Sequence, residues 1–228
     1  MLWRAVACCG MRWHAVGMLW HAVGMLWHAV GMPLLTWAAT RWLAEMVGNI
    51  EDWLSKLLGS MQHTVNGIVR RASHDCETMP LEEFTHAYQS QVALLGIQMK
   101  WTLDCEDALY NAKTNKAAVP SVVKKNQQRL TELVRLNLKP DSELSSNGPW
   151  TRTKIETMIL VDVHQRDCFD DLAKLKVREV EHFEWQKQAR FYYNLEKDVS
   201  QIVIADVEFN YCNEYLGVKE RLVITPLT

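Results

Sequence analysis

The sequence lacks the glycine-rich motifs that bind phosphate groups in nucleotide-dependent enzymes. It has no G-x-x-x-x-G-K-[ST] loop, whose backbone amides cradle phosphates, and no G-x-G-x-x-G dinucleotide turn. The metal and hydrolase signatures H-E-x-x-H and G-x-S-x-G and the EF-hand loop are also missing. We therefore expect the chain alone not to hydrolyse nucleotides, and to supply no catalytic residue, no metal site and no bound cofactor.

The chain has few cysteines, and none of them forms a C-x-x-C pair. Their wide spacing argues against a zinc site or a disulfide framework. No N-x-[ST] glycosylation sequon is present, which fits a non-secreted chain. We expect reduced thiols in a cytosolic protein at Cys8, Cys9, Cys76, Cys105, Cys168 and Cys212.

Charge is also scarce at the start of the chain. The net charge is -2, which points neither to nucleic acid nor to an anionic membrane. Residues 1–40 carry only Arg4 and Arg12, so the rest holds 23 of the 25 basic residues and all 27 acidic ones, a net charge of -4. Six of the ten tryptophans lie at or before Trp42. This shift in composition places a boundary near residue 40.

The first 40 residues contain a seven-residue repeat, M-[RL]-W-H-A-V-G, in three near-identical copies over 11–31. A coiled coil does not fit, because five of seven positions are apolar and glycine recurs in each copy. A metal site on His14, His21 and His28 does not fit either. On a helix these residues would lie about 10.5 Å apart, and a Zn–N bond is only about 2.0 Å long.

A membrane span is the third interpretation of this repeat. No charged residue lies between Arg12 and Arg41, and about 20 apolar residues suffice to cross a bilayer. Three histidines, three glycines and Pro33 argue against it, and the run is too long for a cleaved signal peptide. The favoured interpretation of 1–40 is a low-complexity repeat, unstructured or artefactual, from an expanded nucleotide repeat or a mis-assigned start. A membrane-anchored helical adaptor using residues 13–40 is the alternative.

Beyond Trp42 the spacing of apolar residues predicts amphipathic helices. The first extends from Trp42 to Ile68, although three glycines weaken it by about 1 kcal/mol each relative to alanine. The second starts after Pro80, where two glutamates suit the positive end of a helix. Its apolar stripe comprises Phe84, Tyr88, Val92, Leu95, Met99 and Leu103.

A third helix follows Pro120 and ends before Pro140. Its predicted inward residues are Val123, Leu130, Leu133 and Val134, and its predicted outward residues are Lys124, Lys125, Gln127 and Arg129. Residues 141–149 are rich in turn formers and predict an exposed loop. A fourth helix is predicted over 151–177, and a shorter fifth over 180–191.

After Asn194 the pattern changes from helix to strand. Residues 201–204 are apolar and β-branched, and apolar residues alternate with polar ones over 207–211. Residues 222–225 form another short extended run, which Pro226 ends. The body is therefore expected to be mainly helical, with a small β element at its C-terminus.

The densest group of polar residues covers 162–171. His164 and Cys168 share a helix face there, but two ligands do not make a zinc site. A general acid or base would need a pocket, so we interpret this group as a solvated or ion-paired helix face. Further on, we expect Phe183 and Trp185 to pack near a domain junction rather than to bind a ligand cation.

This polar group also belongs to a set of long, ordered motifs that resemble dynein heavy chains, more closely the axonemal ones than the cytoplasmic one. The resemblance is strong from Leu81 to Thr228, extends back to about Trp42 and is absent over the repeat. The motifs are K-I-E-T at 154–157, V-H-Q-R-D-C-F-D-D-L at 163–172, F-E-W-Q-K-Q-A-R-F-Y at 183–192, N-E-Y-L-G at 213–217 and R-L-V-I-T-P-L-T at 221–228.

The resemblance implies that this region is the C-terminal part of the linker, running into the first AAA+ module. In that family the linker is a helical arm that bends and straightens across the ATP-driven ring. One wall of the adenine pocket would be formed by Leu222, Val223, Ile224, Thr225, Pro226, Leu227 and Thr228. The phosphate loop and Walker-B acid, which hold Mg²⁺ and the phosphates, come later in the family. A complete motor ATPase would need that further sequence.

The expected fold class is mainly α, an elongated helical-bundle linker with a small β element at the C-terminus. The expected domains are the repeat over 1–40, a helical linker segment over 41–195, and the β element with the start of a truncated AAA+ module over 196–228. The expected function is mechanical coupling of ATP-driven changes in the ring to microtubule-based movement, with ATP and Mg²⁺ belonging to the complete motor.

The partners that the resemblance implies are the rest of the heavy-chain ring, dynein intermediate and light chains and, indirectly, microtubules. The implied location is the cytoplasm and cytoskeleton, in the ciliary axoneme. We expect neither a nucleic-acid partner nor a membrane partner.

Overall fold

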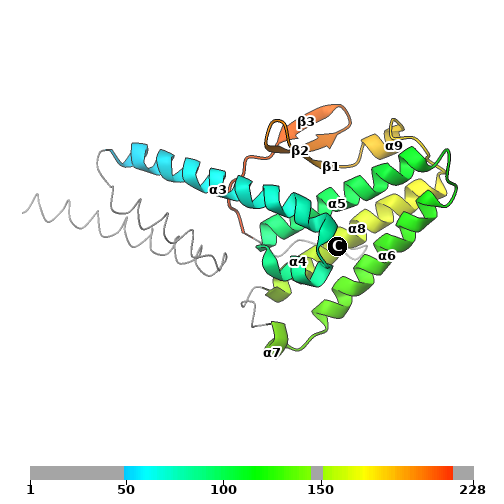
Figure 1. Ribbon diagram of the computed structural model, residues 1–228, viewed down its shortest axis with the longest axis horizontal. Coiled ribbons are helices and arrows are strands. Elements are labelled where there is room, and N and C mark those ends of the chain that lie inside the picture. The colour runs from blue at the N-terminus through cyan, green and yellow to red at the C-terminus, as the bar shows by residue number, and fades with distance from the viewer. Residues whose placement is uncertain (1–48, 145–150, 218–228) are drawn as a thin grey trace, which may run out of the picture. The chain divides into compact units, whose positions relative to one another are not determined.

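A computed structural model describes residues 49–144 and 151–217 of the chain (Figure 1). It comprises two compact units, one that ends at Leu58 and one that begins at Gly59. In the first unit the described residues are 49–58, where helix α3 (Ile50–Thr78) begins with Glu51 and Asp52 in its first turn. The repeat over 1–40, and with it the alternative anchor over 13–40, lies outside the described residues.

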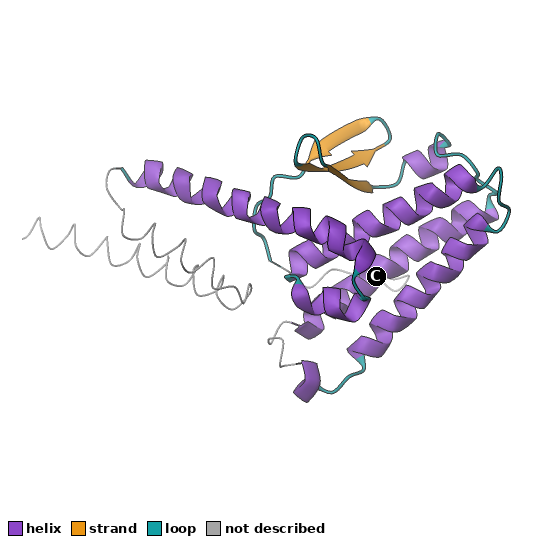
Figure 2. Ribbon diagram, viewed as in Figure 1, coloured by secondary structure: helices purple, strands orange, loops and turns teal. Residues whose placement is uncertain are grey.

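The second unit is built mainly from helices, followed by a small sheet (Figure 2). After α3 come the helices α4 (Leu81–Ala87), α5 (Ser90–Asn111), α6 (Ala118–Asn137), α7 (Asp141–Leu144), α8 (Thr151–Lys174) and α9 (Phe183–Gln186). The strands are β1 (Arg190–Asn194), β2 (Val199–Ile204) and β3 (Val207–Asn210). The prediction of a mainly helical fold with a small β element near the C-terminus is confirmed.

The core of this unit lies among α5, α6 and α8, which pack against one another. One end holds a cluster around Trp101, Phe169 and Trp185, in which the two indole rings lie 5.3 Å apart. The other end holds a larger cluster, in which residues of α3, α4 and α5 pack with Leu133 and Met158. Burial of these large apolar side chains supplies the main favourable free energy of folding.

The three strands form an antiparallel meander in the order β1-β2-β3. Phe191 of β1 pairs with Ile202 of β2, which pairs in turn with Phe209 of β3. β1 lies against α5, and Phe191 and Tyr193 pack onto the larger core cluster. The exposed fraction of Phe209 is 52%, so the sheet is anchored to the helices at its β1 side.

The single helix predicted after Pro80 is wrong, because the chain breaks between α4 and α5 at Tyr88. The backbone there is extended, with φ -109° and ψ 144°. The hydroxyl of Tyr88 donates to Asp75 at 2.5 Å, and the amine of Lys154 donates to the carbonyls of Thr85 and Tyr88. The contacts of Lys154 satisfy two carbonyls that the next helical turn would satisfy in a continuous helix. The predicted stripe is buried except at Leu103.

The predicted faces of the third helix are partly wrong. Arg129, expected to point outward, is only 8% exposed, whereas Val134, expected to point inward, is 40% exposed. Arg129 is buried because it pairs with Asp162 of α8. Leu130 and Leu133 are buried as predicted.

The predicted loop over 141–149 and the predicted fifth helix over 180–191 are both partly wrong. The start of the predicted loop is the short helix α7, whose Leu144 is buried, and residues 145–150 lie outside the described part. The predicted fifth helix is reduced to the four residues of α9, and the aromatic run at 191–193 belongs to strand β1. Aromatic side chains are enriched in strands, and β1 pairs with β2 along its whole length.

Candidate functional site

The residues predicted to border an adenine, Leu222–Thr228, lie outside the described residues. The described chain ends with residues 211–217, which leave the sheet and lead toward that segment. The candidate site is therefore the junction that holds this segment and the sheet on α3 and α5. Its polar contacts are described first, and the buried charges inside the helices follow.

Gln91, in the first turn of α5, holds the segment that leaves the sheet. Its amide nitrogen donates to the hydroxyl of Tyr211 at 2.5 Å and to the carbonyl of Glu214 at 2.6 Å. Its amide oxygen accepts from the backbone N–H of Leu216 at 2.8 Å. One side chain thus binds three points within six residues, so movement of this segment would be passed to α5.

The turn between β1 and β2 is held by α3. Asp198 has a φ of 54°, a left-handed conformation that aspartate tolerates better than most residues. Its carboxylate pairs with the guanidinium of Arg70, its carbonyl accepts from Asn66 at 3.0 Å, and it accepts a hydrogen bond from Tyr193. The bond from Arg70 is the main reason that the pKa of Asp198 is lowered.

Strand β1 is joined to the middle of α5 by two hydrogen bonds, and α9 adds a third. The backbone N–H of Phe191 donates to the hydroxyl of Thr102 at 3.0 Å. Glu106 accepts from the hydroxyl of Tyr192 at 2.5 Å and from the indole N–H of Trp185 at 3.4 Å. Burial, followed by this contact with Glu106, raises the pKa of Tyr192. The sheet is therefore fixed to α5 as well as to α3.

Inside the helical core, Arg129 of α6 and Asp162 of α8 form a buried ion pair. The Arg129 Nε to Asp162 Oδ1 distance is 2.6 Å, and the exposed fractions of the two side chains are 8% and 0%. Burial raises the pKa of Asp162, and the charge of Arg129 opposes that rise. Asn126 and Gln165 lie one helical turn away and are also buried. We interpret this pair as structural, because both side chains are buried in the helical core.

A second buried cation is Lys154, in the K-I-E-T motif. Its amine donates to the carbonyls of Thr85 and Tyr88, where α4 ends, and the Tyr88 distance is 3.1 Å. Lys154 is only 6% exposed, and burial lowers its pKa to about 8. The charge compensates two helix-end carbonyls, as a cation near a helix C-terminus does.

The polar group predicted over 162–171 divides between the core and the surface. Asp162 is buried, whereas His164 is exposed and its Nε2 lies 3.6 Å from the Sγ of Cys168. Burial raises the pKa of the Cys168 thiol, so the thiol is not activated as a nucleophile. No group of three or more metal-binding side chains occurs among residues 49–144 and 151–217.

The four cysteines that the structure describes are free. Within the same described ranges, no helix is long and apolar enough to cross a membrane. Phe183 and Trp185, expected to pack together, separate: Trp185 is fully buried and Phe183 is 64% exposed.

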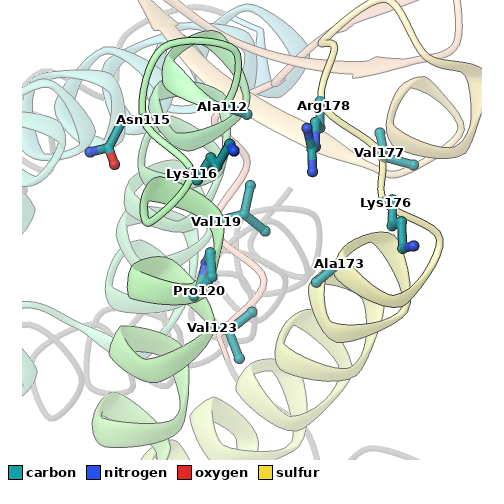
Figure 3. Close-up of a pocket in the computed structure, with 10 residues that line it drawn as sticks. All are labelled: Ala112, Asn115, Lys116, Val119, Pro120, Val123, Ala173, Lys176, Val177 and Arg178. Carbon is teal, nitrogen blue, oxygen red and sulfur yellow. The ribbon is translucent and has the colours of Figure 1, made fainter.

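A pocket of about 360 Å³ lies between the start of α6 and the end of α8 (Figure 3). Lys116 and Arg178 lie on opposite sides of the pocket in Figure 3, and the lining also includes the apolar side chains of Val119 and Val177. Its lining contains no carboxylate, imidazole or thiol, and its charged side chains are all basic. The residues that line it are Ala112, Asn115, Lys116, Val119, Pro120, Val123, Ala173, Lys176, Val177 and Arg178.

Sequence reasoning missed the residues that join the sheet to the helices. Gln91, Arg70 and Glu106 belong to no motif, and the partners described above lie 79 or more residues away in the chain. Arg129 carried a weak signal, because it continues the apolar spacing of Leu133 and Leu136 on the same helix face. A charged residue within an apolar seam indicates a buried partner.

Comparison with known proteins finds sequence similarity to dynein heavy chains. It is 45% identical over 181 residues to the flagellar outer-arm dynein gamma chain of Chlamydomonas reinhardtii. It is 44% identical over 183 residues to dynein axonemal heavy chain 5 of Rattus norvegicus, and 42% over 183 residues to dynein axonemal heavy chain 8 of Homo sapiens. Each match covers 79% of this chain. No family model matches the chain.

The matches cover only a small part of these relatives. The chain spans 4% of the Chlamydomonas protein, 5% of the rat protein and 4% of the human one. The similarity therefore relates this chain to one short segment of much longer proteins.

Proposed function

The chain is homologous to a short segment of the axonemal dynein heavy chains, and from this we propose that it is a mechanical linker segment of such a motor. In this proposal it couples ATP-driven changes in the AAA+ ring to movement along microtubules. It is not catalytic alone. The observation that carries the proposal is the 45% identity over 181 residues, which includes most of the helical body.

The packing of the described residues supports a mechanical role. Helices of 20 to 24 residues lie side by side, and their shared core is closed by fully buried aromatic side chains. Such a core resists compression. Gln91 connects this body to the segment that leads to Leu222–Thr228. A displacement beside the nucleotide would thus reach α5 through one amide side chain.

ATP and Mg²⁺ belong, in this proposal, to the complete motor and not to this chain. Leu222–Thr228 would contribute one wall beside the adenine. The partners would be the heavy-chain ring, the dynein intermediate and light chains and, indirectly, microtubules in the ciliary axoneme. The purified chain is therefore expected to turn over Mg-ATP at the background rate, and turnover well above background would overturn the proposal.

A chimeric motor tests the mechanical role directly. The matched segment of the Chlamydomonas gamma chain is replaced by the 181 matched residues of this chain. ATP turnover and microtubule gliding velocity are then measured on the same preparation. We expect the chimera to retain both activities.

A second chimera carries Leu133→Pro, which breaks α6 within its buried seam. We expect this motor to keep ATP turnover and to lose gliding, because the chemistry lies elsewhere and the arm no longer transmits force. A matched exposed change on the same helix, Lys124→Ala, should leave both activities intact. Normal gliding by the Leu133→Pro chimera would contradict the mechanical role.

A further inference from the structure

Helices α6 and α8 face each other through a seam whose positions alternate by three and four residues. This is the period of 3.5 that characterises a coiled-coil seam. On α8 the seam residues are all buried, and on α6 they are buried or half-buried. They are Thr151, Ile155, Met158, Asp162, Gln165, Phe169 and Leu172 on α8, and Val119, Val122, Asn126, Arg129, Leu133 and Leu136 on α6.

Three polar contacts fix the direction and the register of this seam. As the residue number rises along α6, the number of its partner falls along α8 by nearly the same amount, so the helices are antiparallel. The contacts are Arg166 Nη1 to Gln127 Oε1 at 3.4 Å, Arg129 Nε to Asp162 Oδ1 at 2.6 Å, and Arg152 Nη1 to Asn137 O at 2.6 Å.

The same register is followed by the apolar layers. It places Leu136 opposite Ile155, and these two share one core cluster. It places Leu133 opposite Met158, and these two share another cluster. The seam is thus a stack of layers, each formed by one residue of α6 and the residue of α8 opposite it. The apolar layers resemble one another because each pairs two apolar side chains.

The two layers in the middle of the seam are polar. Arg129 lies opposite Asp162 and forms the buried ion pair. The next layer places Asn126 opposite Gln165, whose exposed fractions are 0% and 4%. Neither polar side-chain atom of Asn126 has a hydrogen-bond partner among the described residues, so this layer consists of two buried amides that are not bonded to each other.

We propose that these two adjacent polar layers hold α6 and α8 in a single register, so that the helix pair moves as a rigid strut. An apolar heptad seam permits a slip of seven residues, about 10.5 Å at 1.5 Å per residue, because apolar layers can replace one another. A slip here would bury Arg129 against Ile155 or Phe169, and Asp162 against Leu136 or Val122. An unpaired buried charge is strongly unfavourable, and a polar seam position is an established means of fixing register.

This inference deepens the proposed function, since a strut that slides would not transmit force. It is tested by disulfide cross-linking of the full 228-residue chain, in a background in which Cys8, Cys9, Cys168 and Cys212 are serine. One reporter pair, Leu133→Cys with Met158→Cys, reads the observed register. The other pair, Leu133→Cys with Thr151→Cys, reads a register that has slipped by seven residues.

Each reporter pair is placed in three seams. The first is unchanged, and the second is all apolar, with Asn126, Arg129, Asp162 and Gln165 replaced by leucine. The third reverses the ion pair through Arg129→Asp with Asp162→Arg. Cross-links are identified by peptide mapping, and circular dichroism measures the helix content of every variant.

The unchanged and reversed seams should cross-link only in the observed register. The all-apolar seam should cross-link in both the observed and the slipped register. Its slipped product should be at least tenfold more abundant than that of the unchanged seam. If that variant loses helix content, the seam with Arg129→Leu and Asp162→Leu alone takes its place. A helical apolar seam that cross-links only in the observed register would overturn the proposal, as would a slipped cross-link in the unchanged seam. Neither measurement depends on motor activity, so this inference and the proposed function fail separately.

Discussion

The ring of Phe84 on α4 lies so close to Gly96 on α5 that a Cβ at Gly96 would be 2.6 Å from the Phe84 Cζ. Phe84 is only 2% exposed, so its ring has no free space into which to move. Gly96→Ala is therefore expected to lower the free energy of unfolding by about 1–3 kcal/mol, the usual cost of overpacking a core. Equilibrium unfolding in urea measures this change.

Gly67 on α3 is the matched control. No atom lies within 4 Å of the position that its Cβ would occupy. Gly67→Ala should be neutral or should stabilise the chain by up to about 1 kcal/mol, because glycine is a poor helix former. Similar losses at both positions would show that Phe84 does not determine the effect.

Removal of one partner from the buried ion pair should be more damaging than removal of both. Arg129→Met leaves Asp162 charged and buried, and is expected to cost about 3–5 kcal/mol in the free energy of unfolding. The double variant Arg129→Met with Asp162→Leu should lose less than either single variant, because no unpaired charge remains. A double-mutant cycle in urea measures the coupling, and additive losses would mean that the two side chains act independently.

The helical body could be predicted from the sequence because its seam residues recur at the helix period. Leu133, Met158 and Phe169 repeat in step with buried helix faces, and the structure buries all three. Arg129 was placed on the wrong face because its charge was weighed without its partner, Asp162, which lies 33 residues away. Periodicity gives the face of a helix, whereas pairing across helices decides which polar residues that face can bury.

The junction between sheet and helices was less accessible to sequence reasoning. Gln91 looks like an ordinary helix residue, and its three partners are known only once α5 and the sheet are placed together. The predicted fifth helix was extended to Phe191, because the extended conformation of β1 depends on pairing with β2. Strand formation is decided by neighbours more than by local preference.

The stability of the chain should rise with pH through the titration of Lys154. Burial lowers the pKa of Lys154 to about 8 from an ordinary value of 10.5. Between these two values the unfolded chain binds more protons than the folded one, so the free energy of unfolding increases with pH. The difference between the unchanged chain and Lys154→Met should grow by on the order of 3 kcal/mol from pH 7.5 to 10.5, at about 1.4 kcal/mol per pKa unit.

Urea unfolding at a series of pH values measures this difference. The tyrosines titrate in the same pH range, but their contribution to the free energy of unfolding is the same in both chains. It therefore cancels when the two free energies are subtracted. Lys154→Arg separates titration from packing, because arginine stays charged throughout and should lack the rise. Parallel curves for the unchanged chain and Lys154→Met would contradict the assignment of the rise to Lys154.

Gln91 should control the mobility of the segment that leaves the sheet. Gln91→Ala removes hydrogen bonds to Tyr211, Glu214 and Leu216, and each is worth about 1 kcal/mol. Because this segment packs mainly at the edge of the core, its release should raise amide exchange over 211–217 while the helices stay protected. Hydrogen–deuterium exchange read by mass spectrometry measures this effect.

Gln98→Ala, seven residues further along α5, is the control and should leave exchange over 211–217 unchanged. If Gln91→Ala instead raises exchange throughout α5, or leaves 211–217 protected, the amide supports the helix and does not transmit movement from the segment that leads to Leu222–Thr228.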